Sequence, residues 1–307
     1  MLGLTLQPAH AARMSFGLSS VGLSYPFAAA IAKGFQEAAA KAGANAVILD
    51  AQGRVQKQAN DIDDLIGQKV DGIALMPLDS VVAQSWVDRA SAAGIAVVAV
   101  GSQIGDPNKR ALQDVYPRLV ALVTQDEVAA GREAGQLAAR IVPRDRTANI
   151  AVIEGAPGFA EVLQRAEGFR QGLEASHVSY RIVASQPGDW TAEKADVTCL
   201  NILAAHPDID LFFNEADDMA VGCAHAVRAA GSHARLVGIG GSKLAVVSIK
   251  AGRIDGTVCY KPEDLGALAF AALYENVTGR GARHGGFITY RTPGVSRSEI
   301  GQCTAQW

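Results

Sequence analysis

The feature that most constrains the fold is a regular alternation between short runs rich in β-branched residues and longer, alanine-rich amphipathic segments. The first short run covers residues 15–20, which itself has no β-branched residue, and the first long segment covers residues 26–42. The same order then repeats along the chain. Such an alternation is typical of βαβ units, in which parallel strands form a sheet and helices cover both of its faces. The sequence therefore predicts an α/β fold with parallel sheets.

The predicted elements fall into two similar halves. A chain of 307 residues is too long for one ordinary core and fits two domains. Gly34-Phe35 in the first predicted helix is echoed about one domain length later by Gly168-Phe169. The predicted strands cover residues 15–20, 46–49, 72–75, 96–100, 119–124, 149–153, 181–184, 211–213, 236–239 and 256–259. The predicted helices cover residues 26–42, 55–69, 81–93, 127–142, 159–176, 191–205, 217–230 and 243–251.

The charge of the chain argues against a nucleic-acid partner, and its hydropathy argues against a membrane-spanning helix. The formal net charge is −3 and the Lys and Arg residues are scattered, so the chain lacks the basic surface that nucleic acid requires. The sequence contains no run of about 18 apolar residues, so we expect no membrane-spanning helix.

Motifs for metal binding and catalysis are missing from the sequence. The four cysteines form no C-x-x-C pair and the six histidines form no H-E-x-x-H pair. No G-x-S-x-G elbow occurs, and the glycine-rich segment 238–243 lacks the spacing of a phosphate-binding loop. We expect no metal, no cofactor and no enzymatic activity.

Residues 1–12 form a short apolar stretch that contains Ala9-His10-Ala11, a pattern of the kind cut by signal peptidase. The segment is either the remnant of a signal peptide or a loose tail, and the remnant is the favoured interpretation because a strand follows directly. The signal-peptide interpretation predicts export to the periplasm.

The four cysteines lie far apart in the sequence, and we expect buried free thiols. In an oxidising compartment, disulfides between Cys199 and Cys223 or between Cys259 and Cys303 are the conceivable alternative.

Four segments resemble the ribose-binding and lac-repressor-like family of sugar receptors, the type I periplasmic binding proteins. They occur in the family's order, and the resemblance covers most of the chain from about residue 14 to about residue 280. The segments are Tyr25-Pro26-Phe27 with Gly34-Phe35, then Gly155-Ala156-Pro157-Gly158 with Arg165 and Gly168-Phe169, then 184–190 ending in Asp189-Trp190, and finally 206–222, which contains Asp217-Asp218-Met219.

The resemblance implies two Rossmann-like lobes joined by a three-strand hinge. The N-terminal lobe would comprise residues 13–124 plus 261–288, and the C-terminal lobe residues 125–260 plus 289–307. The chain would cross between the lobes near 124–126, 260–261 and 289–290. Ligands of open α/β sheets bind beyond the carboxyl ends of the strands, so the loops there should face a cleft between the lobes.

The resemblance also implies a function. The chain would be a monomeric periplasmic solute-binding protein that captures a small carbohydrate or polyol and delivers it to a membrane ABC permease. A sensory receptor that presents its ligand to a membrane kinase or chemoreceptor is the alternative. A transcription regulator of the lac-repressor group would need an N-terminal helix-turn-helix, for which only about a dozen residues precede the first strand.

The expected ligand contacts combine aromatic faces for the C–H side of a sugar with fixed polar groups for its hydroxyls. The resemblance assigns sugar stacking to Phe27 and Trp190 and donation to sugar oxygens to Arg165, whose planar guanidinium suits that task. The full set of expected site residues is Tyr25, Phe27, Ser102, Gln103, Arg165, Trp190, Glu215 and Tyr260.

Three departures from the family's pattern concern the ligand. Where ribose receptors carry an Asp-Arg pair, this chain has Gly101-Ser102, and cleft Asn and Asp positions fall on Ala216 and Gly240. A sugar held by paired carboxylate–hydroxyl bonds would bind weakly without these groups. We therefore expect a ligand other than ribose, namely a polyol or a substituted or deoxy sugar.

Overall fold

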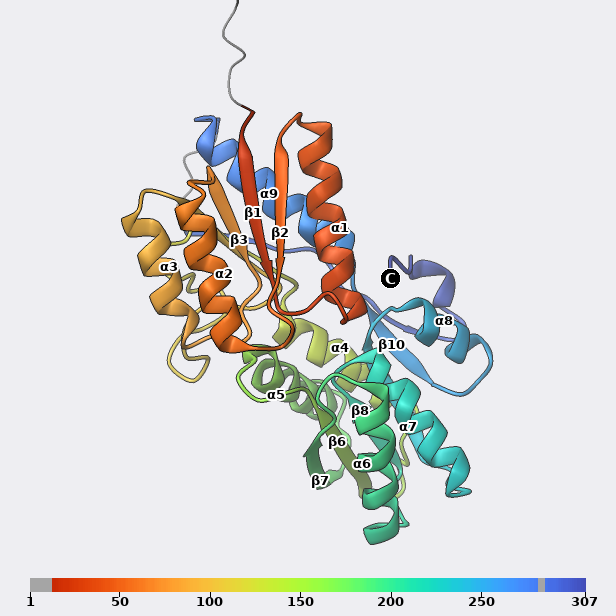
Figure 1. Cartoon of the computed structure of the whole chain (residues 1–307). Helices are drawn as coiled ribbons and strands as arrows, with labels where there is room; N and C mark the ends of the chain where they lie inside the picture. Colours follow the sequence, from red (N-terminus) through yellow and green to blue (C-terminus); the bar gives the residue numbers. More distant parts are fainter. Residues whose placement is uncertain (1–12, 281–284) are drawn as a thin grey trace, which may run out of the picture.

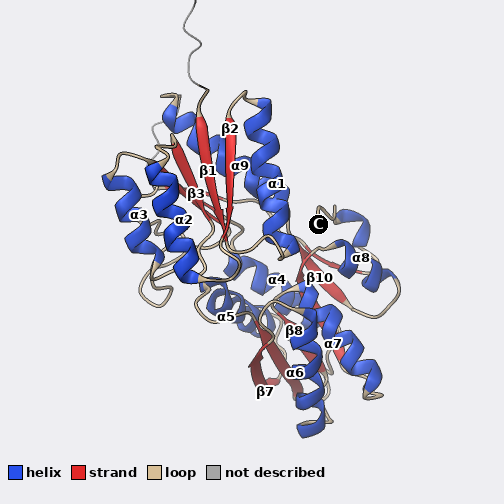
Figure 2. Cartoon of the chain, viewed as in Figure 1, coloured by secondary structure: helices blue, strands red, loops and turns tan. Residues whose placement is uncertain are grey.

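The computed structural model describes residues 13–280 and 285–307. These residues form two α/β lobes, placed one above the other in Figure 1, and each lobe contains a six-stranded sheet with helices packed against it (Figure 2). The predicted fold class is confirmed. The segment 1–12, for which a signal-peptide remnant is expected, lies outside the described residues.

The N-terminal lobe has an entirely parallel sheet in the order β11-β5-β4-β3-β1-β2. Its late segment returns from the other lobe to add a helix and an edge strand. The elements are β1 (Ser15–Ser20), α1 (Pro26–Lys41), β2 (Asn45–Asp50), α2 (Val55–Gly67), β3 (Gly72–Leu75), α3 (Ala83–Ala92), β4 (Ala96–Val100), β5 (Ala121–Val123), α9 (Pro262–Val277) and β11 (Gly286–Ile288).

The C-terminal lobe has the equivalent order β12-β10-β9-β8-β6-β7. Its edge strand β12 runs antiparallel to β10. The sequence predicted parallel sheets, and this sheet departs from that prediction at the edge strand. The elements are α4 (Glu127–Ala139), β6 (Ala148–Glu154), α5 (Ala160–Ala175), β7 (Tyr180–Pro187), α6 (Ala192–Ala205), β8 (Leu211–Asn214), α7 (Asp217–Ala229), β9 (Arg235–Gly240), α8 (Lys243–Lys250), β10 (Gly256–Cys259), β12 (Gly294–Ser296) and the 3-10 turn η1 (Ile300–Gln302).

The chain passes three times from one sheet to the other. It crosses after β5, after β10 and between β11 and β12, which are the intervals that contain the three predicted hinge crossings. The residue-level lobe boundaries remain a prediction. In the two sheet orders β1 lies between β2 and β3, and β6 lies between β7 and β8. The strand order reverses there, so the loops that follow β1 and β6 open at the switch point of each lobe.

Glycines allow the helices on one face of each sheet to pack very closely. A Cβ at Gly34 on α1 would lie 1.9 Å from the backbone oxygen of Glu263 at the start of α9, and a Cβ at Gly168 on α5 would lie 2.0 Å from the backbone oxygen of Val128 on α4. Phe35 and the equivalent Phe169 are buried beside these contacts. The Gly-Phe repeat thus marks the same helix–helix contact in both lobes.

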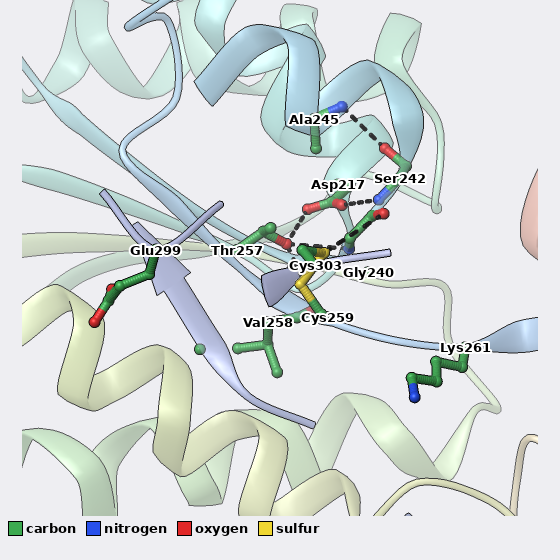
Figure 3. The surroundings of a disulfide bond; sticks show 12 residues. Asp217, Gly240, Ser242, Ala245, Thr257, Val258, Cys259, Lys261, Glu299 and Cys303 are labelled. Carbon is green, nitrogen blue, oxygen red and sulfur yellow. Dashed lines mark hydrogen bonds between the residues drawn. A yellow bond between two sulfur atoms is a disulfide. The ribbon is translucent and has the colours of Figure 1, made fainter. Parts of the chain in front are cut away.

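All four cysteines are disulfide-bonded, so the expectation of free thiols is wrong. Cys199 and Cys223 join α6 to α7 with their Cα atoms 5.4 Å apart, and Cys259 and Cys303 join the end of β10 to the C-terminal segment with a Cα separation of 5.7 Å (Figure 3). Both separations lie in the range that a disulfide requires. Packing of α6 against α7 brings the first pair together, and packing of the C-terminal segment against the end of β10 brings the second pair together. Linear spacing did not reveal either contact.

Within residues 13–280 and 285–307, no helix is long and apolar enough to cross a membrane. The same residues contain no group of three His, Cys, Asp or Glu side chains that could hold a metal ion.

Candidate functional site

A pocket lies between the two lobes, and the carboxyl ends of strands from both sheets contribute to it. The space between its walls, open solvent included, measures about 690 Å³. Six of its residues are aromatic and four carry polar side chains with strong hydrogen-bonding groups. The aromatic residues are Tyr25, Phe27, Phe159, Trp190, Tyr260 and Trp307, and the polar ones are Gln125, Glu161, Arg165 and Asp218.

Phe27 reaches the pocket from the first turn of α1. Tyr25 is the N-cap of this helix and Pro26 occupies its first turn, where the fixed φ of proline favours helix initiation. The ring of Phe27 lies 6.1 Å from that of Tyr260 and 5.5 Å from that of Trp307, measured between centroids. An N-lobe aromatic therefore meets two aromatics from the hinge and the C-terminal segment.

Trp190 reaches the pocket from a strained turn that follows β7. Asp189 and Trp190 have φ values of 51° and 63°, in the left-handed region that non-glycine residues rarely adopt. The indole packs on the ring of Phe159, with 5.6 Å between centroids, and against Gly155, where a Cβ would lie 1.9 Å from the indole ring. Gly155 is required because only a residue without a side chain leaves room for Trp190.

Arg165 is held rigidly at the pocket by a buried ion pair. Its Nε donates to Glu127 Oε2 at 2.7 Å and its Nη2 to Glu127 Oε1 at 3.0 Å, while Nη1 donates to the backbone oxygen of Glu215 at 2.6 Å. The guanidinium carbon also lies 5.5 Å from the Trp190 ring centroid and 5.3 Å from that of Tyr260. Since a guanidinium has five N–H groups, two remain for other acceptors.

Tyr260 completes this network from the hinge. It is 1% exposed, and its hydroxyl donates to Glu127 Oε2 at 2.6 Å. Burial raises the pKa of Tyr260 well above its usual value, so the hydroxyl stays protonated and serves as a donor. Glu127 therefore organises both Arg165 and Tyr260.

The two acidic groups of the pocket have raised pKa values, and Glu161 is only partly ionised at neutral pH. Burial raises the pKa of Glu161 to about 7, although Arg165 opposes the shift, and burial with repulsion from Glu193 raises the pKa of Asp218 to about 6. The pocket is thus less anionic than its residue types suggest.

Two buried polar atoms on pocket residues have no hydrogen-bond partner among the described residues. They are the indole nitrogen of Trp190, a donor, and the amide oxygen of Gln125, an acceptor. An unpaired buried polar group costs about 1–3 kcal/mol. A ligand hydroxyl can both donate and accept, so it suits this pair.

Five of the eight predicted site residues meet at the pocket and three do not. Tyr25, Phe27, Arg165, Trp190 and Tyr260 line it. Ser102, Gln103 and Glu215 are buried and do not line it.

Ser102 and Gln103 instead contact the opposite lobe. The Ser102 hydroxyl donates to Glu161 Oε2 at 2.7 Å, and the amides of Gln103 and Gln164 form a hydrogen bond. The Glu215 carboxyl accepts from the backbone N–H of Gly155 at 2.8 Å, and burial raises its pKa well above the usual value. These side chains have protein partners in place of the ligand contacts expected for them.

Sequence reasoning missed five of the ten aromatic and polar residues that line the pocket. Gln125 lies in the predicted hinge crossing near residues 124–126, and Glu161 lies one helical turn before Arg165. Spacing along the sequence could therefore have found both residues. Asp218 was visible as part of the Asp217-Asp218 pair. No local signal marks Phe159 or Trp307 as site residues, because tertiary packing alone brings them to the pocket.

Comparisons with known proteins identify the family. Residues 16–281 match the family model described as periplasmic binding protein domain. The ribose import binding protein of Bacillus subtilis is 32% identical over 87% of this chain and 82% of its own length, and the D-allose-binding periplasmic protein of Escherichia coli is 31% identical over 90% and 88%. The solved structure of a Caulobacter myo-inositol binding protein bound to myo-inositol superposes with a TM-score of 0.86 at 26% identity, covering 98% of each chain. The chain belongs to the periplasmic binding protein family.

Proposed function

We propose that this protein is exported to the periplasm, captures a small neutral polyhydroxylated molecule in the pocket between its lobes, and delivers it as a monomer to a membrane ABC permease. The observation that carries the proposal is the pocket itself, because aromatic residues from both lobes surround the buried Arg165 and the unpaired polar atoms of Trp190 and Gln125. Aromatic faces fit the C–H side of such a molecule and the polar atoms fit its hydroxyls.

The ligand class follows from the charge of the pocket. Gly101, Ala216 and Gly240 line it without a polar side chain, and the pKa of about 7 leaves Glu161 only partly ionised at neutral pH. Strong carboxylate–hydroxyl bonds are therefore few. This favours a polyol or a substituted or deoxy sugar over ribose.

Ligand binding is coupled to closure of the lobes. Residues of both lobes line the pocket, so only the closed arrangement makes all contacts to a ligand, and binding shifts the hinge equilibrium towards it. Direct bonds between lobes, such as Ser102 to Glu161 and the backbone N–H of Ser80 to the Gly158 oxygen at 3.2 Å, support the same arrangement.

The relatives that carry a function in their names are import or binding proteins, which supports transport over the sensory alternative and over catalysis. The sensory role has no observation in its favour.

A thermal-shift screen over pentoses, hexoses, deoxy sugars, alditols and cyclitols tests the proposal, with amino acids as the control panel. A ligand that binds only the folded state raises the melting temperature by mass action. We expect shifts of several degrees for a polyol or deoxy sugar and a smaller shift for ribose. A panel in which only amino acids give a shift would contradict the proposed ligand class.

A further inference from the structure

Trp307 is fixed at the pocket by contacts to both lobes. Its indole nitrogen donates to the backbone oxygen of Gly240 at 3.3 Å, and its backbone oxygen accepts from the N–H of Lys243 at the start of α8 at 2.7 Å. The indole meets the ring of Phe27 edge-on, with 5.5 Å between centroids and 77° between planes. Figure 1 accordingly shows the C-terminal end of the chain beside the end of α1 that faces the other lobe.

Gly240 makes room for this indole. A Cβ at residue 240 would lie 2.7 Å from the Trp307 ring and 3.1 Å from a carboxylate oxygen of Asp217. The φ of Gly240 is 148°, which also disfavours any other residue. The indole therefore occupies space that a side chain at position 240 would otherwise take.

The disulfide between Cys259 and Cys303 holds the segment 303–307 in place. Figure 3 shows this bond beside Gly240 and the buried Asp217, which accepts from the Thr257 hydroxyl at 2.6 Å and from the Ser242 N–H at 2.7 Å. Cys303 lies four residues before Trp307, and Cys259 directly precedes the pocket residue Tyr260.

Gln306 provides a further anchor, on α9 of the N-terminal lobe. Its amide oxygen accepts from the Glu263 N–H at 2.9 Å and its amide nitrogen donates to Asp264 Oδ1 at 2.9 Å. The segment is thus attached to the hinge, to both lobes and to the pocket.

We propose that Trp307 is a specificity-determining residue that contacts the ligand, and that the Cys259–Cys303 disulfide positions it. This inference rests on the proposed function. The indole presents an apolar surface to the pocket beside Gly240, which has no side chain to offer a polar group. A ligand hydroxyl directed at that surface lacks a partner, which is unfavourable, so Trp307 selects ligands with a C–H or methyl group there.

Calorimetric titration with a 6-deoxy sugar and its parent hexose, or with the best polyol from the thermal-shift screen, tests the inference. We expect Trp307→Ala to weaken binding of the preferred ligand at least tenfold and to reduce the preference for the deoxy sugar. Trp307→Phe keeps an aromatic face and should retain affinity within about threefold. Thr304→Ala, an exposed change in the same segment, is the matched control and should bind as the wild type does.

A double-variant cycle separates positioning from general stability. The Cys259→Ser/Cys303→Ser variant should weaken binding in the wild-type background but cause little further loss when combined with Trp307→Ala, because both changes remove the same contact. Each variant is tested below its own melting temperature. Unchanged affinity and unchanged ligand preference in Trp307→Ala, with normal binding by the wild type, would overturn the inference alone. Failure of the wild type to bind any sugar or polyol would overturn the proposed function as well.

Discussion

The guanidinium of Arg165 and the carboxylate of Glu127 form a two-point ion pair in which Arg165 is 6% exposed and Glu127 is 1% exposed. The pair joins α5 to the start of α4, and it fixes Arg165 beside Trp190 and Tyr260. A polar group for ligand binding is thereby set in place before the ligand arrives, which reduces the ordering cost of binding.

Replacing Arg165 should destabilise the protein strongly. Arg165→Met leaves Glu127 buried without its partner, so we expect the free energy of unfolding in urea to fall by about 3–5 kcal/mol. Arg170→Met, on the exposed side of the same helix, is the control and should change it by less than about 0.5 kcal/mol. Adding Glu127→Gln to Arg165→Met should recover part of the loss, and a stable single variant would argue against this account of the pair.

Gly155 should be essential for the position of Trp190. Gly155→Ala places a Cβ within 1.9 Å of the indole, so the ring must move, and we expect ligand affinity to fall at least tenfold with a smaller effect on folding. Gly67→Ala, at the end of α2 with nothing near its Cβ, should leave affinity unchanged. Calorimetry on both variants checks the prediction, which fails if Gly155→Ala binds normally.

Glu161 should make stability depend on pH. Its pKa is about 7 in the folded protein and near 4.5 when unfolded, so the folded state holds a proton that the unfolded state releases between these values. Its contribution is fully present below about pH 4.5 and is lost as the pH rises through about 7. Glu161→Gln, which can still accept from Ser102, should match the wild type at pH 4.5 and be more stable at pH 8 by up to about 3 kcal/mol. Denaturation without ligand at the two pH values measures this, and parallel pH profiles would contradict it.

The Cys199–Cys223 disulfide should stabilise the C-terminal lobe without changing the affinity for the ligand. It closes a loop with a sequence separation of 24 between two residues that are both 0% exposed. Cys199→Ala/Cys223→Ala should lower the free energy of unfolding by about 3 kcal/mol. Calorimetry should show unchanged ligand affinity, because neither cysteine lines the pocket. A large loss of affinity would show coupling that the structure does not predict.

Local sequence patterns were sufficient to predict most of the fold. The strands at residues 15–20, 72–75, 96–100 and 256–259 have the predicted bounds, because each is a short run between a turn and an amphipathic helical segment. The antiparallel β12 and the edge strand β11 were not among the predicted strands. Each has only three residues and depends on pairing with a distant strand, so its own sequence carries little signal.

The site was predicted in part. Phe27, Arg165 and Trp190 converge on one pocket, as their positions in the family pattern led us to expect. The partners of Ser102 and Gln103 across the lobes and the arrival of Trp307 depend on how the lobes and the C-terminal segment pack. Such contacts join residues far apart in the chain, and a single sequence does not encode them in any local pattern.

Calorimetric titration of Phe27→Ala and Trp190→Ala against the wild type, with the compound that gives the largest thermal shift, tests the central claim most directly. Phe27 belongs to the first helix of one lobe and Trp190 to the other lobe, so a ligand enclosed between them must lose affinity when either ring is removed. We predict one-site binding to the wild type and a loss of at least tenfold, about 1.4 kcal/mol, in each variant. Wild-type affinity in either variant would show that the ligand does not bind between these two side chains.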